Sequence, residues 1–149
     1  MTLPMTPRQH WIGIAQGLQQ DLAGYQALQS LLQQQFHAAL RHDAAAMEAV
    51  AQQITAQAEQ LEAASRQRVL HARALMRAQE DTVSMTQLFL QLKAPLQQQL
   101  QALWDRLQQQ VQECKSLNLR NCRLIMEQAE LMRNVITGGM PDEDIYAPR

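Results

Sequence analysis

Residues 95–137 read PLQQQLQALWDRLQQQVQECKSLNLRNCRLIMEQAELMRNVIT, and this stretch decides the fold of the 149-residue chain. Apolar side chains recur in it at steps of three and four, the spacing of one face of an α-helix. Gly138-Gly139 and then Pro141 end the pattern. We therefore predict one helix over residues 95–137, roughly 64 Å long at about 1.5 Å per residue. Its seam comprises Leu96, Leu100, Leu103, Leu107, Val111, Cys114, Leu117, Asn121, Leu124, Gln128, Leu131 and Val135.

Helix-start signals predict three further helices upstream. Thr6-Pro7-Arg8-Gln9 is a capping box with proline at the first helical position. Asp43 can cap a second helix, so that the residues just before it form a tight turn between antiparallel helices. Ser84-Met85-Thr86-Gln87 is another capping box, and Pro95 closes the short helix that it begins. The predicted helices cover residues 7–40, 44–78, 85–92 and 95–137.

These elements predict an all-α fold, an antiparallel helical bundle or coiled coil of three long helices and one short one in a single domain, residues 1–139. Between Gly24 and Gly138 the only strong breaker is Pro95, which excludes a mostly β or α/β chain. The last helix is more than about 10 Å longer than either long partner, so one end should project or stay partly uncovered. Residues 140–149 are acidic and lack periodicity, which predicts a disordered tail.

Composition excludes several classes of function. Only 18% of the residues are charged, with 13 basic against 14 acidic ones. The net charge of the chain therefore gives it no overall attraction to nucleic acid or acidic lipid. No apolar run reaches the roughly 18 residues of a membrane-spanning helix, and the first residues lack the basic and apolar pattern that would predict a signal peptide. We therefore expect a cytoplasmic protein without membrane insertion. Cys114 and Cys122 lie about 12 Å apart along one helix, too far for a disulfide, and should be reduced.

Catalysis, metal binding and cofactor binding are not predicted. Metal chemistry in a helical bundle typically uses a Glu-x-x-His motif, which this sequence lacks. The four histidines have no second histidine at helical ligand spacing; they are His10, His37, His42 and His71. Arg66, Arg73 and Arg77 share one helix face and leave an RNA adaptor as a competitor, but no aromatic residues interleave with them for base stacking.

The candidate binding surface is the C-terminal half of the last helix. Asn118 and Asn121 interrupt its apolar seam, where a buried asparagine fixes register and partner choice. They either bond across the bundle or await hydrogen bonds from a partner backbone. Further along, apolar residues cover a wider face than one neighbouring helix needs, so a second helix can dock there. The predicted binding residues are Leu117, Asn118, Asn121, Leu124, Ile125, Gln128, Leu131, Met132 and Val135.

Two stretches resemble the FlgN-type flagellar (type III) export chaperones. Residues 31–47, LLQQQFHAALRHDAAAM, look like the family's first helix ending in an aspartate turn. Trp104, Leu107, Cys114 and then residues 117–125, LNLRNCRLI, look like its tryptophan followed by an Asn-x-x-Asn-Gly segment and an aliphatic pair. The sequence departs from the family in having Cys122 where glycine is usual.

The resemblance implies a chaperone that is not an enzyme and needs no cofactor. Such proteins bind the amphipathic C-terminal segments of hook-filament junction proteins (hook-associated proteins), prevent their premature assembly and bring them to the export apparatus. It also implies that the tail meets the export gate or ATPase components, with Ile145 and Tyr146 as the contacts. A structural coiled-coil or adaptor protein that homodimerises through the same seam is the alternative, so either a monomer or a homodimer is expected.

Overall fold

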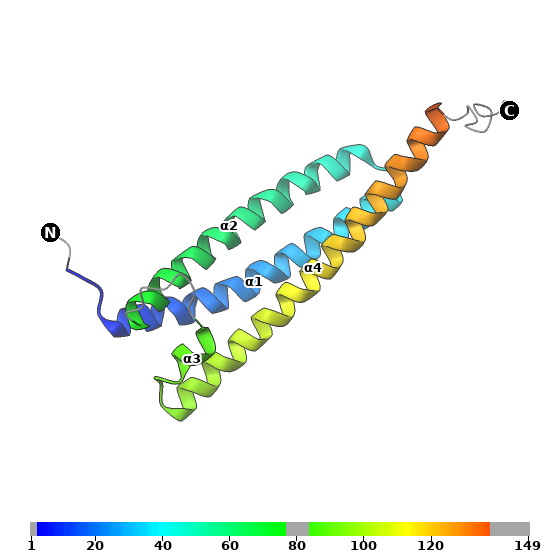
Figure 1. The fold of residues 1–149 in the computed structure, drawn as a ribbon. Coiled ribbons are helices and arrows are strands. Elements are labelled where there is room, and N and C mark those ends of the chain that lie inside the picture. The colour runs from blue at the N-terminus through cyan, green and yellow to red at the C-terminus, as the bar shows by residue number, and fades with distance from the viewer. Residues whose placement is uncertain (1–2, 77–83, 138–149) are drawn as a thin grey trace.

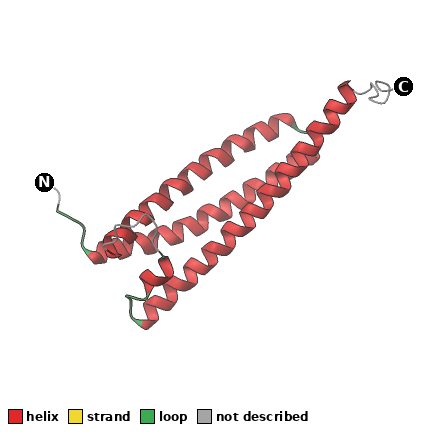
Figure 2. Ribbon diagram, in the orientation of Figure 1, coloured by secondary structure: helices red, strands yellow, loops and turns green. Residues whose placement is uncertain are grey.

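The computed structural model describes residues 3–76 and 84–137, and this part of the chain contains helices and no β-strand (Figures 1 and 2). The four helices are α1 (Pro7–Leu40), α2 (Ala44–Met76), α3 (Met85–Phe89) and α4 (Ala94–Thr137). The predicted all-α architecture of three long helices and one short one is confirmed. The last two residues predicted for the second helix, 77 and 78, lie outside the described residues.

The predicted caps form at the ends of α1 and α2. Thr6 Oγ1 accepts from the Gln9 amide at 3.2 Å, and the Thr6 amide donates to Gln9 Oε1 at 2.8 Å, which completes the capping box. Asp43 Oδ1 accepts from the Ala46 amide at 3.0 Å and caps α2. Between them His42 has φ 55°, in the left-handed region, so the chain reverses within three residues. The helical hairpin is therefore built from local signals.

The prediction for the short helix was wrong at its C-terminal end. α3 ends at Phe89, three residues before the predicted end, and residues 90–92 donate to carbonyls three positions back instead of four. Pro95 does not close this helix. It lies in the first turn of α4, which begins at Ala94, and there its missing amide hydrogen leaves no helical hydrogen bond unmade.

The three long helices lie side by side, with α1 between α2 and α4 (Figure 1). α2 runs antiparallel to α1, whereas α4 runs parallel to it, and α3 packs against α2 and α4 near the start of α4. The main hydrophobic core lies at this end of the bundle and includes Ile14, Leu18, Leu22, Ala72, Leu88, Phe89, Leu100 and Leu107. The core holds the first half of α4, so the second half depends on α1 alone.

Candidate functional site

The C-terminal half of α4 is held on α1 by a regular series of polar contacts. Three α4 side chains spaced seven residues apart each donate to a backbone carbonyl of α1, and the acceptors are also spaced by seven. The pairs are Cys114 Sγ to the Tyr25 carbonyl at 3.5 Å, Asn121 Nδ2 to Leu32 at 2.7 Å and Gln128 Nε2 to Ala39 at 2.8 Å. We call this series the polar ladder. Equal steps in the same direction on both helices show that α1 and α4 are parallel.

Asn121 is the central member of the polar ladder and is only 1% exposed. Besides its bond to the Leu32 carbonyl, its amide donates to Gln35 Oε1 at 2.9 Å, and its own Oδ1 accepts from the Arg120 guanidinium at 3.2 Å. All of these partners lie within the chain. The hypothesis that a partner backbone supplies missing hydrogen bonds is therefore wrong for Asn121, which fixes α4 against α1. Asn118 is exposed.

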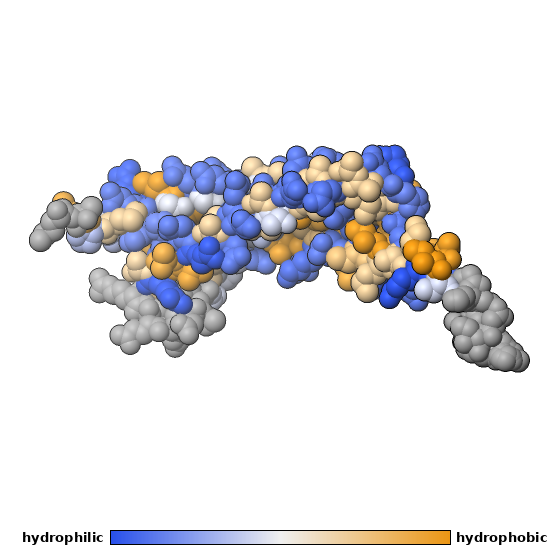
Figure 3. Space-filling view, turned by 90° about the horizontal axis from the view of Figure 1, so that it is seen from above, coloured by the Kyte–Doolittle hydropathy of each residue, from blue (hydrophilic) through white to orange (hydrophobic). Residues whose placement is uncertain are grey.

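Beyond the polar ladder α4 continues without a neighbour. α1 ends at Leu40, directly after the acceptor of Gln128, so residues 129–137 project past the bundle (Figure 1). We call these nine residues the overhang. Its large apolar side chains are mostly exposed, and Figure 3 shows hydrophobic side chains gathered at this end of the molecule. The exposed fractions are 64% for Leu131, 58% for Met132, 71% for Val135 and 74% for Ile136. The predicted uncovered end is confirmed.

The remaining predicted site residues lie beside the polar ladder. Leu117, Leu124 and Ile125 are half-buried, so each presents part of its surface to solvent while it packs on the bundle. Three exposed large apolar residues in this half were not in the predicted site, Leu119 at 52%, Met126 at 69% and Ile136 at 74%. They lie off the seam that faces α1. Their sequence signal is an apolar residue at a position of the helix that faces solvent.

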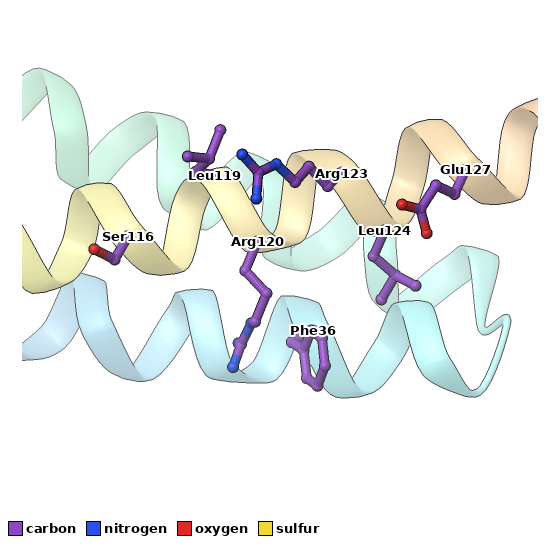
Figure 4. Close-up of a pocket in the computed structure, with 7 residues that line it drawn as sticks. All are labelled: Phe36, Ser116, Leu119, Arg120, Arg123, Leu124 and Glu127. Carbon is purple, nitrogen blue, oxygen red and sulfur yellow. The ribbon is translucent and has the colours of Figure 1, made fainter.

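One shallow pocket of about 470 Å³ lies along the outer side of α4 where it meets α1. Arg120 and Leu124 point from α4 toward α1, and Arg120 lies over the Phe36 ring with its Cζ 3.6 Å from the ring centroid (Figure 4). Leu119 and Arg123 point away from α1 (Figure 4). This pocket offers a stacked cation and an apolar wall, with no group arranged for catalysis among its lining residues.

Two long-range polar contacts escaped the sequence reasoning, because each joins residues far apart along the chain. Asp21 of α1 and Arg68 of α2 form a buried ion pair, and the Arg68 guanidinium also lies 5.4 Å from the Trp104 ring centroid of α4. His10 and His71 meet through their Nδ1 atoms at 2.9 Å. Periodicity within one helix carries no signal for either pair.

Burial shifts the pKa of several side chains. The pKa of His71 is lowered from 6.5, first by burial and then by the nearby His10. Burial also raises the pKa of the Cys114 thiol, with a smaller contribution from Glu113. The pKa of Tyr25 is raised by burial and next by Asp21. None of these groups lies in the overhang, whose ionisable side chains are the exposed Glu130 and Arg133.

The other sequence-based hypotheses have less support. Arg66 is paired with Glu62 at 2.6 Å, Arg73 is half-buried, and Arg77 lies outside the described residues, as do Ile145 and Tyr146 of the predicted export-gate contact. Within residues 3–76 and 84–137 no cluster of three or more histidine, cysteine or acidic side chains could hold a metal ion. The helices described there also include none long and apolar enough to cross a membrane.

Comparison with known proteins gives one match. The family model described as FlgN protein matches residues 13–137, which cover most of α1 and all of α2, α3 and α4. The matched region includes the polar ladder and the whole overhang. Neither the curated proteins nor the solved structures include a match to this chain.

Proposed function

Because the chain belongs to the FlgN family of flagellar export chaperones, we propose that it binds the amphipathic C-terminal segments of hook-filament junction proteins on the second half of α4. The bound segment is kept from premature assembly and is delivered to the export apparatus from the cytoplasm. The overhang is the observation that supports this proposal. An amphipathic helix that packs on the overhang buries its own apolar face and covers the apolar side chains that α1 leaves exposed.

The predicted binding residues divide into two roles under this proposal. Leu131, Met132 and Val135 are exposed and contact the client directly, together with the free surfaces of the half-buried leucines and Ile125. Asn121 and Gln128 act through α4, because their hydrogen bonds to α1 set how far the overhang projects. No step of this function involves covalent chemistry or a bound nucleotide.

The test replaces two exposed aliphatic residues of the overhang with aspartate. The double variant Leu131→Asp with Val135→Asp should weaken binding about 100-fold, since each loses an apolar contact worth roughly 1–2 kcal/mol. The matched control is Leu70→Asp, at a leucine on α2 that is 58% exposed against 64% for Leu131. Isothermal titration calorimetry against the C-terminal segments of the junction proteins encoded in the same genome measures both.

Circular dichroism must show that the variants keep their helical content. If the double variant remains helical and binds as tightly as the native protein, the site is wrong. If none of the junction segments binds the native protein, the function itself is wrong.

The exposed overhang also favours a second candidate function, homodimerisation by a structural coiled-coil protein. However, the overhang contributes only nine residues per copy, whereas a standard interface has about 20–30 residues a side. The overhang alone is therefore too small for a stable dimer. Light scattering during size-exclusion chromatography separates the candidates: a dimer that persists on dilution and is abolished by the overhang variant favours the structural protein.

Contact with the export gate is a separate part of the proposal. Ile145 and Tyr146 follow the overhang in an acidic stretch, and Tyr146 is the only aromatic residue after Trp104. Tyr146→Ala should leave the affinity for junction segments unchanged and reduce their export. If Tyr146→Ala reduces binding and export equally, Tyr146 has no separate role at the export gate.

A further inference from the structure

The C-terminal half of α4 carries a second heptad seam next to the one that faces α1. Its members follow one another at alternating steps of four and three residues, which places them in one stripe along the helix. They are Val111, Lys115, Asn118, Cys122, Ile125, Ala129, Met132 and Ile136. A helix with two adjoining seams is built to pack against two neighbours. α1 occupies only the first.

The second seam borders a trough between α2 and α4 whose floor is α1. Among the described residues no Cα of α2 comes within 8 Å of a Cα of α4, so the two backbones stay apart, and Arg68 of α2 reaches the Trp104 ring of α4 only through its side chain. A pocket of about 260 Å³ lies between them and is lined mainly by apolar side chains. Its lining comes from all three long helices: Tyr25, Leu28 and Leu32 of α1, Ile54 and Ala58 of α2, and Val111, Cys114, Lys115 and Asn118 of α4.

Resting on the proposed function, we propose that this trough receives an amphipathic helix of the client, which completes a four-helix bundle and presents a carboxylate to Lys115. Lys115 is the only charged side chain among the residues that line the pocket. It lies within an apolar stripe, where a cation is stabilised by an opposite charge on the helix that covers it. An apolar stripe with one acidic residue near the end that faces Lys115 is therefore the chemistry that fits.

The length of the second seam also favours a client helix as the occupant of the trough. From Val111 to Ile136 it spans 25 residues, or about 38 Å, and it joins the trough to the overhang without a break. The residues that follow Thr137 begin with Gly138-Gly139 and Pro141, which do not favour a helix. A second copy presents the same seam, which contains Lys115 and no acidic residue, so it offers that cation no carboxylate. A separate helix of about 25 residues that carries an acidic residue covers the whole seam and pairs with Lys115.

The test fills the trough from the α2 side, away from the overhang. Ala58 is exposed and lines the pocket, so Ala58→Trp should weaken binding of the junction segments at least about tenfold by occupying the place of the client helix. The matched control is Ala56→Trp, another exposed alanine on α2 that lies at a different surface pocket. Calorimetry measures both, with circular dichroism as the check on folding.

A charge reversal tests the predicted chemistry. Lys115→Glu should weaken binding about tenfold, and replacing the acidic residue of the junction segment that faces Lys115 with lysine should restore it. Lys93→Glu, at an exposed lysine outside the trough, is the control and should have no effect. Rescue by the paired reversal supports direct contact, because a merely structural effect of Lys115→Glu is not repaired by a change in the client.

The outcomes separate this inference from the proposed function. If junction segments bind, the overhang variant abolishes binding and Ala58→Trp leaves it unchanged, the client does not enter the trough while the function stands. If the free protein is a dimer that Ala58→Trp converts to a monomer, a second copy is the occupant and the inference is wrong. If deleting residues 138–149 raises the affinity at least about tenfold, those residues occupy the trough, which overturns the inference equally. If no segment binds the native protein, both proposals fail.

Discussion

Asn121→Ala tests whether the polar ladder holds the two parallel helices together. The substitution removes two hydrogen bonds that the buried amide donates, to the Leu32 carbonyl and to Gln35. At about 0.5–1.5 kcal/mol for each buried hydrogen bond, this loss comes to about 1–3 kcal/mol. The void left by the side chain adds roughly 1 kcal/mol. Alanine regains about 0.5 kcal/mol in helix propensity, so the free energy of unfolding should fall by about 2 kcal/mol.

Thermal and urea denaturation followed by circular dichroism measure this change. For a chain of this size, a loss of 2 kcal/mol lowers the melting temperature by about 4–8 °C. The matched control is Asn118→Ala, one turn earlier on α4, where the asparagine is exposed and its one side-chain contact is a weak one, with the Cys122 thiol at 4.0 Å. That variant gains the same helix propensity but loses no buried hydrogen bond and leaves no void. Its free energy of unfolding should therefore be unchanged or higher by about 0.5 kcal/mol. Equal small effects of the two substitutions would refute the role assigned to Asn121.

Three further predictions concern the α1–α2 hairpin. Asp21→Ala leaves the Arg68 guanidinium buried without its carboxylate, and urea denaturation should show a loss of about 3 kcal/mol; a loss no larger than that of an exposed substitution contradicts the buried pair. Because burial and His10 lower the pKa of His71 in the folded protein, the unfolded chain binds more protons below pH 6.5. Stability should therefore fall as the pH decreases from 6.5 toward the folded pKa, and His71→Gln should flatten this fall in denaturation series between about pH 8 and pH 5. Gly17→Ala should raise stability by about 0.5–1 kcal/mol in thermal denaturation, since nothing lies within 4 Å of the added Cβ, whereas Gly13→Ala places its Cβ 2.6 Å from His71 Nε2 and should not. Equal gains at both glycines would count against the close approach of His71.

The features predicted correctly from the sequence are those that local physics determines. A capping box, an N-terminal aspartate and the three-and-four spacing of apolar residues each act over fewer than ten residues, and they located both ends of α1 and the start of α2. The overhang also followed, because helix length is proportional to residue number. The end of α3 did not. Phe89 is completely buried in the core, and residues 90–92 tighten into a turn that no local residue signals.

Pairings between helices could not be read from one sequence. The seam of α4 predicts that some helix lies against it, but the direction and register of the partner depend on which carbonyls its polar side chains reach. Asn121 illustrates the difference: its position in the seam was evident, whereas its acceptor, the Leu32 carbonyl, lies 89 residues earlier. The trough escaped notice for the same reason, since its walls are α2 and α4, which do not touch through their backbones.

The polar ladder explains how a helix can project without sliding. A seam of leucines at these three positions would pack almost equally well one heptad along, because the carbonyls of α1 repeat with the same period. The donors instead lengthen from Cys114 to Asn121 to Gln128, so a shift of seven residues would pair each carbonyl with a side chain of the wrong length. Shifting α4 back would also bury unpaired amides, each at a cost of about 1–3 kcal/mol. The length of exposed apolar helix beyond α1 is therefore fixed by hydrogen bonds between α4 and α1.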